Sequence, residues 1–300
     1  MDITITLSMI LRYGQRIIVY PAGFADRPRE VMTPDRLLIP YEDVELLTKD
    51  KVKLRCFLIR KPDGEHANAR GTVILFHGNA MDHGDNLGYA QRLFAENFNV
   101  FSLEYRGYGH SEGVPSESGL CLDAQAALDY VVNDPVLSKL PIIIYGQSLG
   151  GAVAIDVTSK NPDKISALMV ENTFTSAPDV IKGFPGIIGY LAFLVTQKWY
   201  SANKVSRMPP TLPILMLSGT SDQVIPPSHM AKLWKVASTR NPALKRRSGA
   251  VPEYTPPQND VFQAFRYGEH NTTAYQAEYW NTVYRFLDKV LNNSDTPAVE

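Results

Sequence analysis

The chain has 300 residues, of which 44% are hydrophobic and 20% are charged, a composition typical of a globular protein with a sizeable core. Its formal net charge is -1, so no basic field favours nucleic acid as a partner. Two cysteines, Cys56 and Cys121, are too few for a disulfide framework, and we expect both to be reduced.

Residues 1–39 are expected to form an irregular lead-in, because prolines punctuate this stretch. Residues 1–11 lack a basic segment and a cleavage site, so no signal peptide is predicted. No apolar run approaches the roughly 18 residues that a membrane-spanning helix needs. The mildly apolar character of the opening residues is compatible with a peripheral membrane contact.

From residue 40 onward the pattern predicts one α/β domain. The stretches 41–48 and 54–60 are extended in character and suggest an antiparallel pair. Buried strands then alternate with amphipathic helices, which is typical of βαβ units in a parallel sheet. The expected strands of this part are 73–76, 100–103, 142–145, 167–170, 214–217 and 261–267. The expected helices place apolar stripes over 87–98, 120–131, 230–234 and 274–291.

Two segments depart from this alternation. Residues 172–210 are rich in aromatic side chains and are interpreted as an inserted cap, either a pair of core-packed helices or a lid over the active site. Residues 239–259 are polar and proline-rich, and they carry the basic run Lys245-Arg246-Arg247. They are predicted to form an exposed surface loop. Its positive charges are expected to be solvated, and contact with a partner or a lipid headgroup is the alternative.

The chemistry is centred on Ser148. A strand-like run, Ile142-Ile143-Ile144, leads into Gly146-Gln147-Ser148-Leu149-Gly150, and a helical run follows. This is the context of a G-x-S-x-G nucleophile elbow, in which the serine sits on a strained turn between strand and helix. Gly146 and Gly150 provide the room that such a turn requires.

A serine nucleophile needs a base and a group that orients the base. In this architecture the acid and then the histidine follow the serine along the chain. Asp222 follows the strand at 214–217 and His270 follows the next strand, so these two residues are the predicted acid and base. Glu171 is the alternative acid. His77 and His229 are the alternative bases, and His229 is expected at the surface.

The predicted oxyanion hole uses the backbone N–H groups of Leu149, directly after the serine, and of Asn79, in the loop after the first parallel strand. A metal site is the less favoured interpretation of the polar side chains near that loop, because their spacing matches no closed zinc pattern. Those side chains are His77, Asp82, His83 and Asp85. We therefore predict neither a metal nor a cofactor.

Several motifs resemble one subfamily of the α/β-hydrolases, which comprises fungal hydrolases associated with cell-polarity phenotypes and the animal α/β-hydrolase domain protein 13. The motifs are Phe76-His77-Gly78-Asn79-Ala80, the turn at 104–113, Gly146-Gln147-Ser148-Leu149-Gly150-Gly151, Val170-Glu171-Asn172-Thr173-Phe174 and the stretch 221–227. The resemblance extends from about residue 17 to 290. It implies the triad Ser148, Asp222 and His270, the oxyanion positions Asn79 and Leu149, and an intracellular, membrane-associated serine hydrolase.

Two departures accompany the resemblance: the chain shows no apolar membrane anchor, and the segment 239–259 is longer than in the animal proteins. The combined prediction is a hydrolase that cleaves an acyl ester or thioester in a small molecule or an acylated protein. An interaction protein built on the same fold, in a membrane or cell-polarity complex, is the alternative from another class, since fold alone does not give function. A serine peptidase is the alternative within the enzymes.

Overall fold

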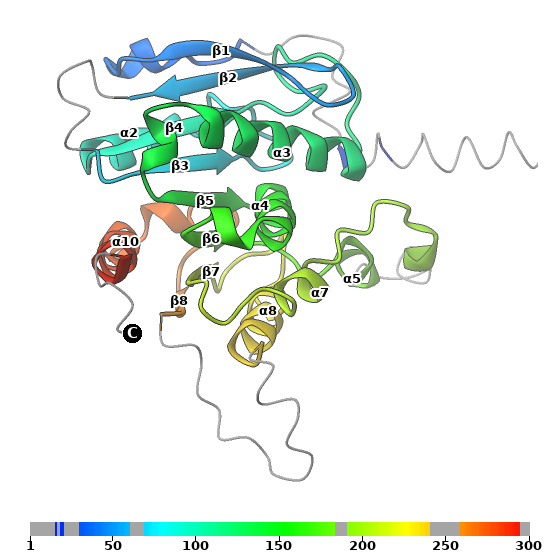
Figure 1. The fold of residues 1–300 in the computed structure, drawn as a ribbon. Helices are drawn as coiled ribbons and strands as arrows, with labels where there is room; N and C mark the ends of the chain where they lie inside the picture. The colour runs from blue at the N-terminus through cyan, green and yellow to red at the C-terminus, as the bar shows by residue number, and fades with distance from the viewer. Residues whose placement is uncertain are drawn as a thin grey trace, which may run out of the picture.

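A single eight-stranded sheet runs through the chain (Figure 1). The computed structural model describes residues 16, 19–20, 30–60, 69–183, 191–240 and 259–294. The strands are β1 (Glu42–Leu47), β2 (Lys53–Ile59), β3 (Gly71–Phe76), β4 (Phe98–Leu103), β5 (Ile142–Gln147), β6 (Ala167–Glu171), β7 (Ile214–Gly219) and β8 (Val261–Phe265). Their order in the sheet is β1-β2-β4-β3-β5-β6-β7-β8.

The sheet is mostly parallel. The strands β1 and β2 form the expected antiparallel pair, and β2 also runs antiparallel to β4. All later pairs are parallel, so β3, β5, β6, β7 and β8 end at the same edge. Every residue of β3, β4, β5, β6 and β7 is buried, as expected for strands covered on both faces.

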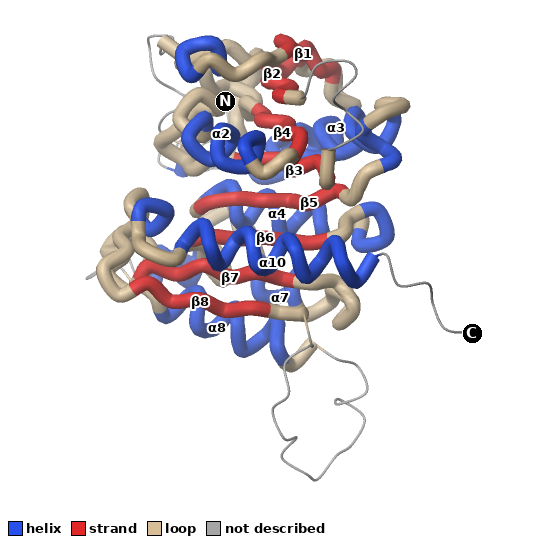
Figure 2. Tube along the Cα trace, turned by 90° about the vertical axis from the view of Figure 1, so that its left-hand side faces the viewer, coloured by secondary structure: helices blue, strands red, loops and turns tan. Residues whose placement is uncertain are grey.

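Helices cover both faces of the sheet (Figure 2). The helices α3 (Glu117–Asn133), α4 (Leu149–Lys160) and α8 (Ser228–Ser238) pack in one apolar cluster on one face, while α2 (Leu87–Ala95) and α10 (Tyr279–Ser294) contribute to a second cluster on the other. Shorter elements are η2 (Pro34–Leu37), η4 (Leu137–Lys139), η5 (Pro162–Lys164), α5 (Ala177–Lys182), η6 (Leu191–Leu194), α7 (Ser201–Val205) and η7 (Thr273–Tyr275).

Two helix boundaries differ from the sequence-based prediction because of local backbone geometry. Asn97 has a φ of 63° and ends the turn after α2, so Phe98 belongs to β4 and not to the apolar stripe of that helix. Glu278 has a φ of 64° and immediately precedes α10, which therefore begins at Tyr279. Left-handed residues interrupt a helix that side-chain periodicity alone would continue.

The predicted cap contains α5, η6 and α7, with residues 184–190 outside the described part. Trp199 is its packed centre: the side chain is 1% exposed, and its indole N–H donates to the Tyr20 hydroxyl at 2.9 Å. Phe193, in contrast, is 72% exposed. Most of the predicted lead-in and nearly all of the predicted surface loop at 239–259 lie outside the described residues.

Candidate active site

Ser148 lies on a sharp turn between β5 and α4. Its φ of 55° and ψ of -117° fall outside the ordinary allowed regions for a non-glycine residue. The neighbouring glycines have no room for side chains: a Cβ on Gly146 would lie 2.1 Å from the Gly150 carbonyl oxygen. A Cβ on Gly150 would lie 2.1 Å from the Phe76 carbonyl oxygen. This close packing forces the strained turn and directs the Ser148 side chain off the end of the strand.

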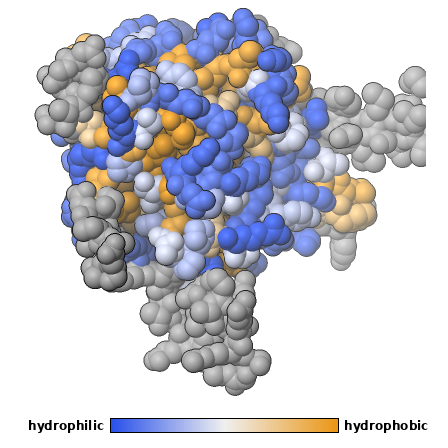
Figure 3. Space-filling model, viewed as in Figure 1, coloured by the Kyte–Doolittle hydropathy of each residue, from blue (hydrophilic) through white to orange (hydrophobic). Residues whose placement is uncertain are grey.

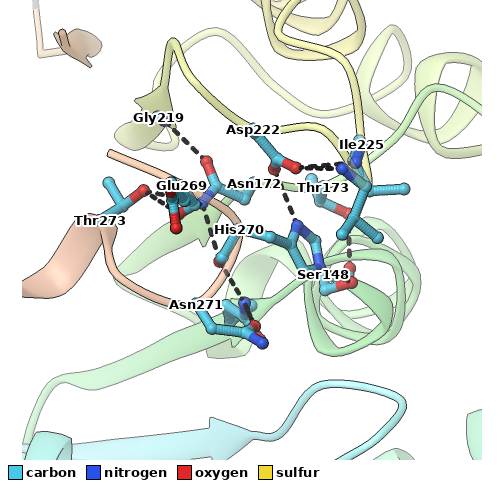
Figure 4. Close-up of polar contacts among 12 residues, drawn as sticks. Ser148, Asn172, Thr173, Gly219, Asp222, Ile225, Glu269, His270, Asn271 and Thr273 are labelled. Carbon is cyan, nitrogen blue, oxygen red and sulfur yellow. Dashed lines mark hydrogen bonds and ion pairs between the residues drawn. The ribbon is translucent and has the colours of Figure 1, made fainter. Parts of the chain in front are cut away.

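Three predicted side chains meet at the carboxyl edge of the sheet (Figure 4). His270 Nε2 lies 2.9 Å from Ser148 Oγ, and His270 Nδ1 lies 2.8 Å from Asp222 Oδ2. The other carboxylate oxygen of Asp222 accepts the backbone N–H groups of Val224 and Ile225, both at 2.8 Å. These two bonds fix the carboxylate so that Oδ2 faces the imidazole.

Such an arrangement can activate a hydroxyl. When Asp222 accepts a hydrogen bond from the Nδ1–H of His270, Nε2 is the unprotonated nitrogen that faces the serine hydroxyl and can act as the base. The side chain of Asp222 is 1% exposed and that of His270 is 12% exposed. The acid is therefore shielded from water, whereas the imidazole remains accessible to a bound substrate.

The two predicted oxyanion residues occupy suitable backbone positions. Leu149 is the first residue of α4, where backbone N–H groups have no partner inside the helix. Asn79 lies in the turn after β3, and its side chain donates to the Val19 carbonyl at 2.6 Å and accepts from the Tyr108 hydroxyl at 2.7 Å. Neither backbone N–H bonds to another described residue.

Glu171, the alternative acid, points elsewhere. Its Oε2 accepts the hydroxyls of Tyr145 at 2.6 Å and Tyr89 at 3.2 Å, and it also accepts from Tyr279. Burial raises the pKa of this fully enclosed carboxyl group. Within the described part of the chain, the ring of His270 contacts Asp222 and not Glu171.

His77, one alternative base, is buried in the core beside β4. Its Nε2 lies 3.0 Å from Glu104 Oε1, and both side chains are 0% exposed. His83 approaches the same carboxylate, with 3.7 Å between its Nε2 and Glu104 Oε2. Asp82, by comparison, accepts the backbone N–H groups of Gly84 and Asp85 in the adjoining turn.

His229, the other alternative base, was wrongly predicted to lie at the surface. It is 6% exposed, because the start of the cap segment covers it. Its Nδ1 lies 3.0 Å from the hydroxyl of Thr175, whose hydroxyl also donates to Asp179 at 2.9 Å. Within the described part of the chain, His229 is not a member of the hydrogen-bond chain formed by Ser148, His270 and Asp222.

Sequence reasoning missed two residues of this region. The side-chain amides of Gln147 and Asn172 both donate to the backbone carbonyl of His270, at 2.8 and 3.0 Å. Both residues lie in the motifs quoted above, but the motifs do not reveal a contact that spans about a hundred residues of sequence. These bonds attach the histidine loop to the strands beside Ser148.

A serine on a strand-to-helix elbow, set in this mostly parallel eight-stranded sheet, places the molecule in the α/β-hydrolase fold class. Solved structures agree. A Pyrococcus furiosus esterase, Pf2001, superposes with a TM-score of 0.66 at 21% identity, covering 88% of this chain and 97% of the esterase. An α/β-hydrolase from Vibrio vulnificus superposes with a TM-score of 0.70 at 20% identity, covering 92% and 93% of the two chains.

Sequence comparison specifies the family more closely. A family model described as serine aminopeptidase, S33, matches residues 67–211. Protein bem46 of Schizosaccharomyces pombe is 38% identical over 98% of this chain and 91% of its own length. The α/β-hydrolase domain-containing protein WAV2 of Arabidopsis thaliana is 33% identical over 94% and 90%. A Saccharomyces cerevisiae relative described as an uncharacterized membrane protein is 34% identical over 95% and 92%. The chain therefore belongs to the α/β-hydrolase superfamily, in the family of protein bem46.

Proposed function

We propose that the protein is a serine hydrolase that cleaves an acyl ester or thioester through an acyl-enzyme on Ser148. The observation that carries the proposal is the continuous chain of hydrogen bonds from Ser148 Oγ through the imidazole of His270 to Asp222. A serine hydroxyl is a weak nucleophile at its own pKa, and this arrangement supplies both the base and the group that orients the base.

In the first half of the reaction, Ser148 Oγ attacks the acyl carbonyl carbon while His270 Nε2 takes the hydroxyl proton. The tetrahedral intermediate collapses, the bond to the alcohol or thiol breaks, and His270 returns the proton to that leaving group. In the second half a water molecule repeats the attack on the acyl-enzyme, and the carboxylic acid and free Ser148 are released. Asp222 keeps its negative charge throughout and stabilises the imidazolium.

The backbone N–H groups of Asn79 and Leu149 are the proposed donors to the oxyanion. Their positions support this role, because one follows the serine at the start of α4 and the other lies in the turn after β3. Loss of one oxyanion donor typically lowers kcat by about 10²–10³-fold. A backbone donor at the start of a helix also benefits from the helix dipole.

An apolar acyl chain is the favoured part of the substrate, and a lipid surface is its favoured source. Phe193, Leu194 and Tyr200 of the cap are 72%, 39% and 47% exposed. Figure 3 shows an apolar area over this segment, together with further apolar areas on the same face. No helix among the described residues is long and apolar enough to cross a membrane. Peripheral contact through the cap is consistent with the yeast relative that is named a membrane protein.

A peptidase is the second candidate, because the matching family model carries a peptidase description. That match ends at residue 211, before Asp222 and His270, and so does not include the acid or the base. A non-catalytic interaction protein is the third candidate. The structure offers it no particular support, since all three polar groups of the hydrogen-bond chain are in place.

A substrate panel tests the proposal. A chain-length series of p-nitrophenyl esters is run beside an acyl-thioester and a peptide p-nitroanilide, with the parent and Ser148→Ala. We expect turnover of the ester and thioester by the parent alone. Turnover confined to the peptide amide would establish the peptidase. Equal, background-level turnover of every substrate by parent and variant would favour the interaction protein.

A further inference from the structure

The loop that carries His270 is a turn between β8 and α10, not part of a regular element. The imidazole is bonded at its two nitrogens to Asp222 and Ser148. Those bonds orient the ring only if the backbone that carries it is also fixed. A misplacement of about 1 Å can cost roughly a hundredfold in rate, so the position of this backbone matters to the reaction.

Two side-chain amides fix that backbone. The His270 carbonyl oxygen accepts from Gln147 Nε2 at 2.8 Å. It also accepts from Asn172 Nδ2 at 3.0 Å, and Figure 4 shows this second bond. A carbonyl oxygen has two lone pairs, and both are used here. We call Gln147 and Asn172 the amide clamp. We propose that the amide clamp positions His270 against Ser148, an inference that rests on the proposed function.

The two donors come from the strands that flank the nucleophile. Gln147 is the last residue of β5 and immediately precedes Ser148. Asn172 directly follows Glu171, the last residue of β6, and Glu171 pairs with Gln147 in the sheet. The amide clamp therefore ties the histidine loop to the same backbone that carries the serine hydroxyl. Any shift of the loop relative to the elbow must break at least one of these bonds.

Asn172 is itself held on both sides. Its Oδ1 accepts the Gly219 N–H of β7 at 2.8 Å, and its Nδ2 also donates to the hydroxyl of Thr273 at 2.9 Å. Its φ of 44° is a left-handed conformation, in which asparagine is several-fold enriched among non-glycine residues. The side chain is used as an acceptor toward β7 and as a donor toward the histidine loop. An aspartate has the same shape but cannot donate, and it would set a carboxylate oxygen against the His270 carbonyl.

Gln147 reaches a third part of the site. Its Nε2 also contacts Asn271 Oδ1 at 3.2 Å, and its Oε1 lies where a Cβ on Gly78 would come within 2.5 Å. Gly78 precedes Asn79 in the proposed oxyanion loop. One amide thus packs between that loop and the histidine loop. Among the described contacts, neither clamp side chain bonds to Ser148 Oγ or to the imidazole ring, so both are positioning residues.

The test compares Asn172→Asp and Gln147→Met with the parent. The matched control is Asn97→Asp, because Asn97 is an exposed asparagine with a φ of 63° far from the site. The measurements are kcat and KM for a p-nitrophenyl ester, the rate of fluorophosphonate labelling, and the temperature of unfolding. We expect kcat and the labelling rate to fall about a hundredfold in Asn172→Asp and about tenfold in Gln147→Met, because the reacting groups are misaligned. KM should stay within about threefold of the parent, as expected when an interaction specific to the transition state is lost.

A merely structural role would lower the temperature of unfolding but leave the labelling rate of the folded molecules at the parent value. That result, or a parental kcat in both clamp variants, would overturn the proposal. If Asn172→Asp does not fold, Gln147→Met decides, since methionine preserves length and adds no charge. Ser148→Ala is assayed alongside. Labelling of that variant at the parent rate refutes the proposed function itself, whereas an inert Ser148→Ala with parental clamp variants refutes only the amide clamp.

Discussion

Two histidine–carboxylate pairs lie close to the carboxyl ends of strands in this sheet, and they differ in what surrounds them. His270 and Asp222 are 2.8 Å apart, and His77 and Glu104 are 3.0 Å apart. The ring of His270 is partly exposed and faces the Ser148 hydroxyl. The ring of His77 is fully buried, and its Nδ1 lies 2.9 Å from the Gly78 carbonyl.

Aromatic rings pack around the His77–Glu104 pair, which is fully buried. The ring centroid of His77 lies 4.1 Å from that of Tyr105 and 5.4 Å from that of Tyr108. No serine or cysteine among the described residues contacts either nitrogen of His77. The same two chemical groups therefore serve a structural role in the core and the proposed catalytic role at the edge. The pair at the edge differs from the pair in the core because its imidazole faces the Ser148 hydroxyl and is accessible to substrate.

The largest expected effect is the loss of activity when the His270 imidazole is removed. His270→Ala should lower kcat by about 10⁴-fold or more, since loss of a general base removes most of the catalytic power of such a site. Steady-state hydrolysis of a p-nitrophenyl ester measures this loss. His110→Ala is the control, because His110 is exposed and should leave kcat unchanged. A turnover within tenfold of the parent in His270→Ala would assign the base elsewhere.

The second prediction distinguishes Asp222 from Glu171, the alternative acid. Asp222→Asn should lower kcat by about 10⁴-fold, because an amide does not hold the imidazole in the required tautomer. Glu171→Gln should leave kcat within a few-fold of the parent, since the Glu171 carboxylate faces tyrosines and not the His270 ring. The two variants are compared in the same ester assay. The reverse ranking of the two would transfer the role of the acid to Glu171.

The third prediction concerns the stability of the buried pair. Glu104→Leu removes the carboxylate beside His77 Nε2 and also the acceptor of the buried His83 backbone N–H, which donates to Glu104 Oε2 at 3.2 Å. Leaving a buried polar group unsatisfied should lower the free energy of unfolding by about 1–3 kcal/mol. Urea denaturation measures this free energy, and Glu112→Leu, at an exposed glutamate, should change it little. An unchanged stability in Glu104→Leu would show that the pair contributes nothing to folding.

The smallest effect is a pH dependence of stability that comes from His83. Burial lowers the pKa of His83 from 6.5 to about 4. Between these values the unfolded chain binds a proton that the folded chain does not, so the contribution of His83 to stability is lost as pH falls from 6.5 toward 4. We expect His83→Phe, which preserves the ring stacked on Phe57, to lose less stability than the parent between pH 7 and pH 5.

Urea midpoints at several pH values measure that difference, and His110→Gln should retain the parent slope. Equal slopes in the parent and His83→Phe would mean that His83 is protonated in both states or in neither. The comparison is specific to His83, because the other titrating groups are common to the parent and the variant.

The sequence predicted the fold well because strand and helix periodicities are local. The alternation of buried strands and amphipathic helices led to the mostly parallel sheet, and the G-x-S-x-G run predicted the elbow on which Ser148 lies. Chain order then indicated Asp222 and His270, which the fold brings together. Their catalytic roles are proposals that the variants above test.

Features that depend on distant parts of the chain were harder to predict. His229 was expected at the surface because its position early in a helix reveals nothing about the cap segment that covers it. Phe98 was assigned to a helix that a left-handed Asn97 ends. The contact of Asn172 with the His270 carbonyl joins residues 98 positions apart, and no local pattern predicts such a bond.

The proposed role of Ser148 as nucleophile is tested by locating the covalent adduct of a fluorophosphonate probe. The parent and Ser148→Ala are treated together, and the adduct is located by mass spectrometry of the digested protein. We expect one adduct per molecule on Ser148 in the parent and none in the variant. Equal labelling of the two proteins, or an adduct on another residue of the parent, would show that Ser148 is not the nucleophile.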